Sequence, residues 1–296
     1  MKELTIISGK GGTGKTSITA PLAFLAGNRV VIDADVDAAN LFLTLEYEQI
    51  RETEFRGGSK AEILPDLCTE CGECRERCQF DAISEDFVID PISCEGCSVC
   101  VHFCPAEAIK FEQQVCGKKY LSKTGNGPMV HARLGIAEEN SGLLVSELRQ
   151  EAREIAEKEN IPLIITDGPP GIGCPVIASV TNSDAVLIVT EPSMSGIHDM
   201  ERVKSLADQM RVPAFLCINK ADLNPETSNV IRNFAEKNNI RFVGEIPFDR
   251  DVIDSMKEKK SLIEYSDGPA SRAVREVWKN VSRFMNDITE KNNVNS

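Results

Sequence analysis

Short apolar runs recur along most of the chain, and segments with helical spacing of apolar positions separate them. The runs are rich in β-branched residues and short, which is typical of buried strands. They occupy residues 4–7, 30–32, 163–166, 185–189 and 214–218. This alternation predicts βαβ units, and therefore an α/β fold with a mostly parallel sheet flanked by helices. In such folds ligands bind at the carboxyl ends of the strands.

The alternation stops after the second run and resumes near residue 141 with a helix that we expect to reach about residue 158. Between Glu62 and Glu112 there are 12 acidic side chains against 3 basic ones. We therefore predict an inserted small α+β domain at residues 61–113, with residues 1–60 and 114–296 forming the two parts of the α/β domain. Residues 118–127 contain several Lys, Gly and Ser residues and are predicted to be a return linker or mobile loop.

Composition narrows the class of protein. Apolar residues make up 42% of the 296-residue chain and charged residues 27%, which is ordinary for a globular protein. The net charge of -13 argues against nucleic-acid binding, which depends on Lys and Arg displacing counterions. No apolar run approaches the roughly 18 residues that a membrane span needs, and the first residues enter a strand. We therefore expect a soluble cytoplasmic protein that binds neither nucleic acid nor membrane.

A glycine-rich octet follows the first predicted strand and precedes a helix, which is the context of a phosphate-binding P-loop. Its residues are Gly9, Lys10, Gly11, Gly12, Thr13, Gly14, Lys15 and Thr16. The glycines allow backbone N–H groups to converge on phosphate oxygens at the start of the helix. In this motif Lys15 is expected to contact the β- and γ-phosphates and Thr16 to ligate Mg²⁺.

Polar residues follow three further strands. Asp33, Asp35 and Asp37 come at the end of the second run, and such crowded carboxylates beside a triphosphate require a cation such as Mg²⁺. Asp167 follows the run at residues 163–166, and residues 219–222 read Asn-Lys-Ala-Asp after another strand. That last string also matches the guanine-reading motif of GTPases, so both ATP and GTP remain open on these residues alone.

Eight of the 11 cysteines form two runs with the same internal spacing, and each position recurs after 26 residues. The runs are Cys68, Cys71, Cys74, Cys78 and Cys94, Cys97, Cys100, Cys104. Residues 81–83 also recur in similar form at residues 107–109, which indicates two copies of one small unit. In a chain of this size, such clusters indicate metal ligation rather than disulfides.

This spacing is typical of ferredoxins that hold two 4Fe-4S clusters, in which the fourth cysteine of each run ligates the other cluster. We therefore expect Cys68, Cys71, Cys74 and Cys104 to hold the first cluster. Cys94, Cys97, Cys100 and Cys78 are expected to hold the second. Zinc is the alternative metal, although zinc sites usually pair two shorter motifs across a longer gap. The clusters could carry electrons or serve only as structural cross-links.

Together the octet, the aspartate segments and the cysteine runs resemble the MinD/ParA superfamily of P-loop ATPases, in a form with an inserted ferredoxin domain. The nitrogenase iron protein and Mrp-type iron-sulfur carriers are relatives of that superfamily. The resemblance implies a homodimer in which Lys10 reaches the partner's nucleotide. It also implies that Asp35 positions the attacking water, that Asp33 supports the metal site and that Asn40 assists.

The same resemblance implies roles for the later segments and favours ATP over GTP. Asp167 would hold the Mg²⁺ shell, and the Gly171 N–H would sense the γ-phosphate. Asn219, Lys220 and Pro247 would surround the adenine. The residues expected to take part in catalysis are therefore Lys10, Lys15, Asp35 and Asp167.

Three cysteines lie outside the two runs, and Cys174 differs from the other two. It comes seven residues after Asp167, the offset that in the nitrogenase iron protein leads to a cysteine of a cluster shared between subunits. Two copies of Cys174 could therefore share an additional cluster, or the residue could be an ordinary partly buried thiol.

Three functions are compatible with these residues. The first is an ATPase whose nucleotide state gates electron transfer through the two clusters. The second is an iron-sulfur assembly or carrier ATPase, and the third is a redox-sensing regulatory ATPase. In each case we expect a redox partner or an iron-sulfur client protein.

Overall fold

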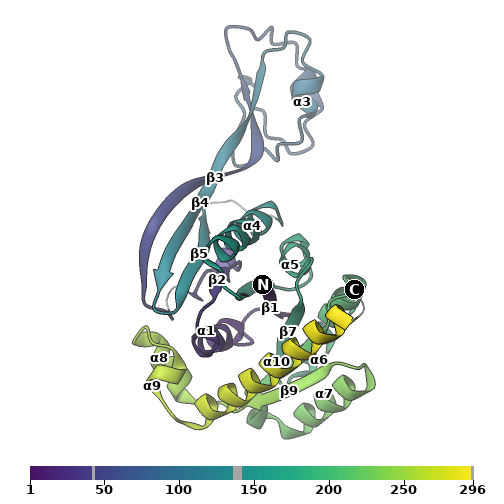
Figure 1. Cartoon of the computed structure of the whole chain (residues 1–296). Helices are drawn as coiled ribbons and strands as arrows, with labels where there is room; N and C mark the ends of the chain where they lie inside the picture. The colour runs from purple at the N-terminus through teal and green to yellow at the C-terminus, as the bar shows by residue number, and fades with distance from the viewer. Residues whose placement is uncertain (42–43, 136–141, 295–296) are drawn as a thin grey trace. The chain divides into compact units, whose positions relative to one another are not determined.

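The computed structural model describes residues 1–41, 44–135 and 142–294 (Figure 1). These residues fold into two compact units. The first comprises residues 1–53, residues 119–133 and the chain from residue 142 onward. The second comprises residues 54–118 with Leu134 and Gly135. The inserted domain that we predict at residues 61–113 lies within the residue range of the second unit.

The sheet contains nine strands in the order β3-β4-β5-β2-β6-β1-β7-β8-β9. All five predicted runs are strands in it. The parallel part contains β1 (Lys2–Ser8), β2 (Val30–Asp33), β6 (Leu163–Pro170), β7 (Ala185–Thr190), β8 (Ala214–Asn219) and β9 (Arg241–Ile246), and also Gly127–Leu134, which pairs in parallel with β2. Neighbouring strands from β2 to β9 in this order pair in parallel. Their carboxyl ends therefore lie at one edge, as a P-loop fold requires.

Three strands extend the sheet beyond β2, and they correct one prediction. They are β3 (Tyr47–Ile63), β4 (Ile109–Thr124) and β5 (Gly127–Leu134). Residues 118–127, predicted to be a linker or mobile loop, instead form the end of β4, a two-residue turn and the start of β5. Ser122 and Thr124 are buried and Lys123 between them is exposed, so the alternation of a strand is present but is carried by polar residues.

Helices follow most strands of the first unit. They are α1 (Lys15–Ala26), α4 (Gly142–Glu159), α5 (Cys174–Val180), α6 (Met194–Gln209), α7 (Pro225–Lys237), α8 (Arg250–Lys257), α9 (Leu262–Tyr265) and α10 (Pro269–Val294), with 3-10 turns η1 (Val36–Ala38) and η3 (Ala221–Leu223). Helix α4 agrees closely with the helix predicted to end near residue 158.

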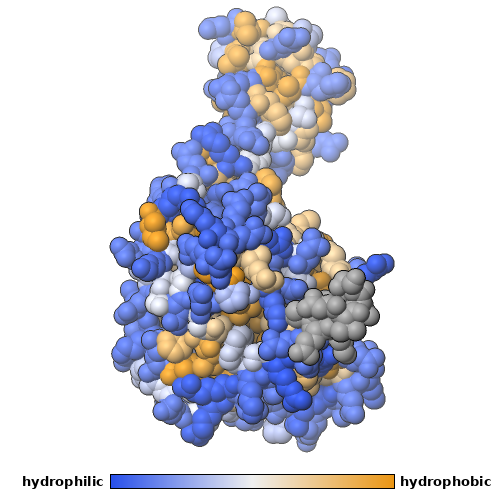
Figure 2. Space-filling view, viewed as in Figure 1, coloured by the Kyte–Doolittle hydropathy of each residue, from blue (hydrophilic) through white to orange (hydrophobic). Residues whose placement is uncertain are grey.

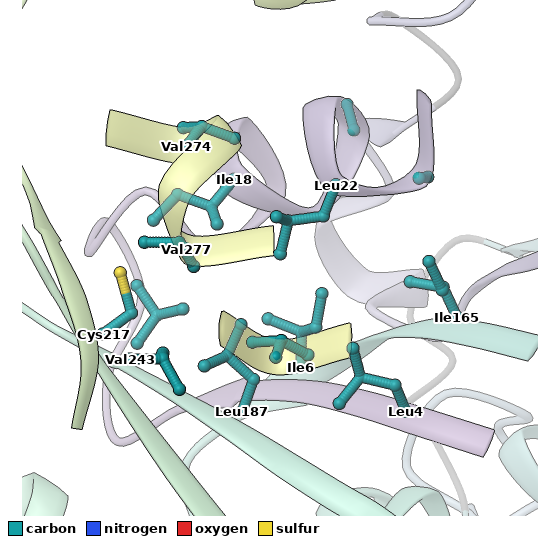
Figure 3. Close-up of a cluster of buried hydrophobic side chains, with 14 of the residues drawn as sticks. Leu4, Ile6, Ile18, Leu22, Ile165, Leu187, Cys217, Val243, Val274 and Val277 are labelled. Carbon is teal, nitrogen blue, oxygen red and sulfur yellow. The ribbon is translucent and has the colours of Figure 1, made fainter. Parts of the chain in front are cut away.

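Two apolar cores cover the two faces of the sheet, because successive strand residues point to opposite faces. On one face, α1 and α10 pack against strand residues such as Leu4, Ile6 and Leu187, as Figure 3 shows. On the other face, residues of α5, α6 and α7 pack against the neighbouring positions Ile7 and Ile188. This packing fixes the strand ends that carry the polar residues of the candidate site.

The second unit repeats its own backbone after 26 residues. Helix α2 (Glu73–Glu76) recurs as α3 (Val99–His102), each a single turn after a left-handed residue, Gly72 or Ser98. The positive φ angles of Asp81 and Glu107 also recur at this interval. The sequence repeat therefore corresponds to a structural repeat.

Candidate functional site

The glycine octet joins β1 to α1, as predicted. Gly12 and Gly14 have φ angles of 81° and 85°, a conformation that favours glycine. A Cβ at Gly14 would lie 2.2 Å from Nδ2 of Asn219, so this position also requires a residue without a side chain. Helix α1 begins at Lys15 and directs its unpaired N–H groups toward the loop.

Lys15 lies at the centre of a buried charge cluster. Its side chain is 5% exposed, and Nζ lies 2.8 Å from Oδ1 of Asp167 and 3.3 Å from Oδ2 of Asp35. Burial lowers the pKa of Lys15, but the charges of Asp167, Asp35 and Asp33 raise it by more, so the net pKa lies above its usual value. Lys15 therefore keeps its positive charge in the position where the P-loop motif expects phosphate contact.

The two predicted Mg²⁺ ligands are adjacent. Thr16 Oγ1 donates a hydrogen bond of 2.6 Å to Oδ2 of Asp167, which is itself fully buried. Among the described residues, no three His, Cys, Asp or Glu side chains are close enough to hold a metal ion. In the usual Mg²⁺ site of nucleotide enzymes, water and phosphate supply most of the ligands.

Asp33 is also fully buried. Its Oδ2 accepts a hydrogen bond of 3.1 Å from the backbone N–H of Leu41, while Oδ1 has no hydrogen-bond partner among the described residues. Burial first, and then the charge of Asp167, raise the pKa of Asp33 to about 8. Burial likewise raises the pKa of Asp35, although Lys15 partly offsets this. A divalent cation nearby would favour the ionised form of these carboxylates, so the site fits Mg²⁺.

A cavity of about 400 Å³ adjoins this cluster. Its wall brings together Gly11–Ser17 of the loop and first turn, Asp35, Asn40 and the last two residues of β6, Pro169 and Pro170. The Gly171 N–H, which the resemblance assigns to the γ-phosphate, donates to the carbonyl of Ser8 at 2.9 Å in this structure.

The segment after β8 contacts the P-loop backbone instead of lining that cavity. Asn219 Nδ2 donates to the carbonyl of Thr13 at 2.7 Å, and Lys220 Nζ lies 3.3 Å from the carbonyl of Gly12. Asp222 Oδ1 accepts a hydrogen bond of 2.6 Å from the backbone N–H of Phe248, which follows Pro247. These contacts bring the predicted base-binding residues to the same end of the sheet as the P-loop.

Lys10 contacts a residue that the sequence motifs did not assign to the site. Its Nζ lies 2.7 Å from Oε1 of Glu191 and 2.8 Å from Oγ of Ser195. Lys220 lies 3.5 Å from the other Glu191 oxygen. The signal for Glu191 was its place directly after β7, at the same sheet edge as the P-loop.

The eight clustered cysteines of the second unit surround two cavities. Cys68, Cys71, Cys74 and Cys104 line one of them. Cys78, Cys94, Cys97 and Cys100 line the other. Each set contains three cysteines of one run and the fourth of the other run. Cys74 and Cys94 are buried among apolar residues such as Ile63, Ile83 and Ile109, whereas Cys71 and Cys97 are exposed.

The remaining cysteines lie apart from these sets. Cys116 and Cys217 are buried, and burial raises the pKa of Cys217 to about 12. Cys174 is exposed at the first residue of α5.

In the part of the chain that the structure describes, no helix is long and apolar enough to cross a membrane.

Comparison with known proteins agrees with the fold. The CobQ/CobB/MinD/ParA nucleotide binding domain matches residues 4–263. An uncharacterized protein of Methanocaldococcus jannaschii is 34% identical over 96% of this chain and 97% of its own length. An iron-sulfur cluster carrier protein of Pyrococcus abyssi is 24% identical over 97% of this chain and 87% of its own.

Among solved structures, the septum site-determining protein MinD of Pyrococcus horikoshii, complexed with Mg-ADP, is similar in fold. Its TM-score is 0.60 at 16% identity, over 97% of this chain and 98% of that one. The family match covers the P-loop, the aspartate cluster and the segment at residues 219–222. The chain therefore belongs to the CobQ/CobB/MinD/ParA nucleotide-binding family and is a P-loop ATPase of the MinD/ParA type.

Proposed function

We propose that this protein is an ATPase in which the nucleotide state gates electron transfer through two 4Fe-4S clusters. The observation that carries the proposal is the composition of the two cysteine-lined cavities. Each combines three cysteines of one run with the fourth of the other, which is the crossed pattern of two-cluster ferredoxins. Residues 61–113 would then be a ferredoxin-like domain inserted into the ATPase domain.

The spacing of the two cysteine runs supports cubane clusters over zinc, because zinc sites usually pair two shorter motifs across a longer gap. In a cubane each thiolate binds a different iron, and four cysteines line each cavity. When bound, such a cluster supplies a one-electron redox centre.

The nucleotide roles follow from the buried charge cluster. Lys15 would contact the β- and γ-phosphates, and Thr16 and Asp167 would hold Mg²⁺. Asp35, which lines the cavity beside the loop, would position the attacking water, with Asn40 nearby. Lys10 would act on the nucleotide of a second copy in a homodimer.

The path of the chain supports coupling between nucleotide binding and electron transfer. Asp35 and Asn40 line the nucleotide cavity, and β3 begins only a few residues later, at Tyr47. That strand starts in the first unit and ends in the second at Ile63, beside Cys68 in the wall of one cysteine-lined cavity. A shift of the segment after β2 on ATP binding would therefore be transmitted along a continuous strand to the first set of cysteines.

The test is the reoxidation rate of the reduced clusters in the intact protein, measured with no nucleotide, with ADP and with ATP. The proposal expects ATP to change the rate in the wild type and in Lys279→Ala, a control at an exposed lysine of α10. It expects Lys15→Ala to abolish the difference while the iron content stays the same. A rate that is independent of nucleotide in the wild type would rule out gating.

An iron-sulfur carrier is the second candidate, because the Pyrococcus abyssi relative named for that role matches nearly the whole chain. Here ATP turnover would control release of a cluster to a client protein. Two results together would favour this candidate. Transfer of iron to an apo-ferredoxin would require Lys15, and the nucleotide would leave electron-transfer rates unchanged. Partner binding that depends only on the redox state would favour a regulatory ATPase.

Cys174 allows one further cluster in the proposed dimer. Its thiol is exposed, so a second copy of the chain could approach it. Iron quantitation in Cys174→Ala decides the question within the dimer. Iron content and spectra equal to those of the wild type assign Cys174 as an ordinary thiol, whereas a lower iron content in the variant dimer than in the wild-type dimer supports a shared cluster.

A further inference from the structure

A groove of about 770 Å³ lies on the second unit, next to one of the cysteine-lined cavities. Residues from β3, from β4 and from the segment 86–92 form its walls, and Cys68 lies in both the groove and the cavity. The nucleotide function accounts for none of these residues. Because Cys68 lines both, the groove adjoins the first set of cysteines.

Part of the groove wall is apolar and exposed. The exposed fractions of Val88, Ile92 and Val115 are 64%, 75% and 45%. In the region around α3, Figure 2 shows apolar residues among hydrophilic ones on the surface of this unit. Apolar side chains that gather at a concave site are typical of a binding surface.

The charge of the groove indicates what it binds. Glu62, Glu70, Asp86 and Glu112 line it, against Lys60 and Lys110 only. Lys110 pairs with Glu112 at 2.9 Å, and Lys60 donates to the carbonyl of Cys94 at 2.7 Å. The remaining carboxylates lie in a stretch that is strongly acidic overall, so the potential in the groove favours a cationic ligand.

We infer that this groove is the docking site for a basic, apolar-tipped surface of a protein electron-transfer partner. Electrons would then pass between that partner and the cluster held by Cys68. The inference rests on the proposed function, because it assigns a partner to the same clusters. Complexes of electron-transfer proteins bury small interfaces and depend on charge, which suits a groove of this size.

The test uses cytochrome c, a basic haem protein, as the probe and the intact protein with its iron as the target. Binding of oxidised cytochrome c to the oxidised protein is measured by calorimetry at low salt. The groove variant is Glu62→Gln with Asp86→Asn. The matched control is Glu76→Gln with Glu107→Gln, which changes the charge of the same unit equally at two exposed residues outside the groove.

The groove variant is expected to raise the dissociation constant of cytochrome c by at least about threefold. The factor for the control variant is expected to be less than about half as large. Ile92→Ser should also weaken binding, whereas Ile50→Ser, at an exposed isoleucine of β3 outside the groove, should not. Equal effects of groove and control variants would overturn the inference. No binding of cytochrome c by the wild type would overturn it as well.

A second readout separates this inference from the proposed gating. The second-order rate of cytochrome c reduction by the reduced protein is measured with and without ATP. Rates that fall only in the groove variants but do not respond to ATP would support docking in the groove and rule out nucleotide gating. Rates that respond to ATP but are equal in groove and control variants would support nucleotide gating and rule out docking in the groove.

Discussion

Lys10 and Glu191 form an ion pair within one chain, with Nζ and Oε1 2.7 Å apart. The pair joins the P-loop to the segment between β7 and α6. Burial raises the pKa of Glu191, but hydrogen bonds and charge from Lys10 and Lys220 lower it by more, so Glu191 remains ionised at neutral pH. If Lys10 acts on the nucleotide of a second copy, it must first leave Glu191.

The variant Glu191→Gln should therefore increase ATP hydrolysis at protein concentrations where dimer formation limits the rate. The pair is partly exposed, so its loss is worth at most about 1 kcal/mol, or a rise of about fivefold. Hydrolysis is measured over a dilution series, with Glu201→Gln on the exposed face of α6 as the control. The rise should vanish in the double variant with Lys10→Ala, and a rise that persists there would contradict this role for Lys10.

The variant Lys15→Ala should lower ATP hydrolysis by at least about 100-fold, because positioning and charge stabilisation supply most of the catalysis of phosphoryl transfer. It also leaves Asp167 and Asp33 buried without their nearest cation. Steady-state phosphate release with Mg²⁺ measures the effect, and Lys279→Ala at an exposed site is the control. Retention of a tenth of the wild-type rate or more would remove Lys15 from the proposed mechanism.

His131 of β5 should make stability depend on pH. It is 2% exposed and stacks on Tyr120, and burial first, then the charge of Arg133, lower its pKa to about 4. The unfolded chain binds a proton near pH 6.5 and the folded chain does not, so stability falls as the pH drops below 6.5 and levels off below 4. This group alone contributes a loss of about 2 kcal/mol between pH 7 and 5.

Denaturant unfolding of the wild type and of His131→Phe over that pH range measures this contribution. Other titrating groups are common to both proteins, so the difference between the two pH profiles isolates His131. The variant should lack about 2 kcal/mol of the wild-type pH dependence. Profiles that run parallel between pH 7 and 5 would show that His131 takes up its proton in the folded state.

Sequence patterns predicted β1, β2, β6, β7 and β8 because their runs are apolar on both faces, as buried parallel strands are. The same patterns missed β3, β4 and β5. Residues 47–54 of β3 are all exposed, so no apolar alternation marks the strand. The end of β4 alternates between buried Ser122 or Thr124 and exposed lysine, which resembles a loop in composition.

In the candidate site, too, the sequence predicts some residues and misses others. The octet and the cysteine runs have fixed spacings, as expected where local backbone geometry must fit a bound group, so the sequence alone predicts Lys15 and Cys68 as site residues. Glu191 contacts Lys10 from a strand end far away in the chain, and no local spacing encodes that contact. The groove beside Cys68 depends on three separate segments, which only the folded unit brings together.

The crossed ligand sets can be tested by pairs of substitutions. Replacing Cys68 and Cys104 by serine removes two ligands from one cavity, so one cluster should be lost and about four iron atoms should remain. Replacing Cys68 and Cys78 removes one ligand from each cavity, although both belong to the same run. That variant should lose both clusters and nearly all of its iron.

The two double variants change the same number of cysteines, so each controls for the other. If each run held its own cluster, the outcomes would be reversed: Cys68→Ser with Cys78→Ser would keep about four irons and Cys68→Ser with Cys104→Ser would keep almost none. Iron and acid-labile sulfide per chain are the measurements, made on protein purified without oxygen. Cys217→Ser, at a buried thiol of β8 outside both cavities, should keep the full iron content.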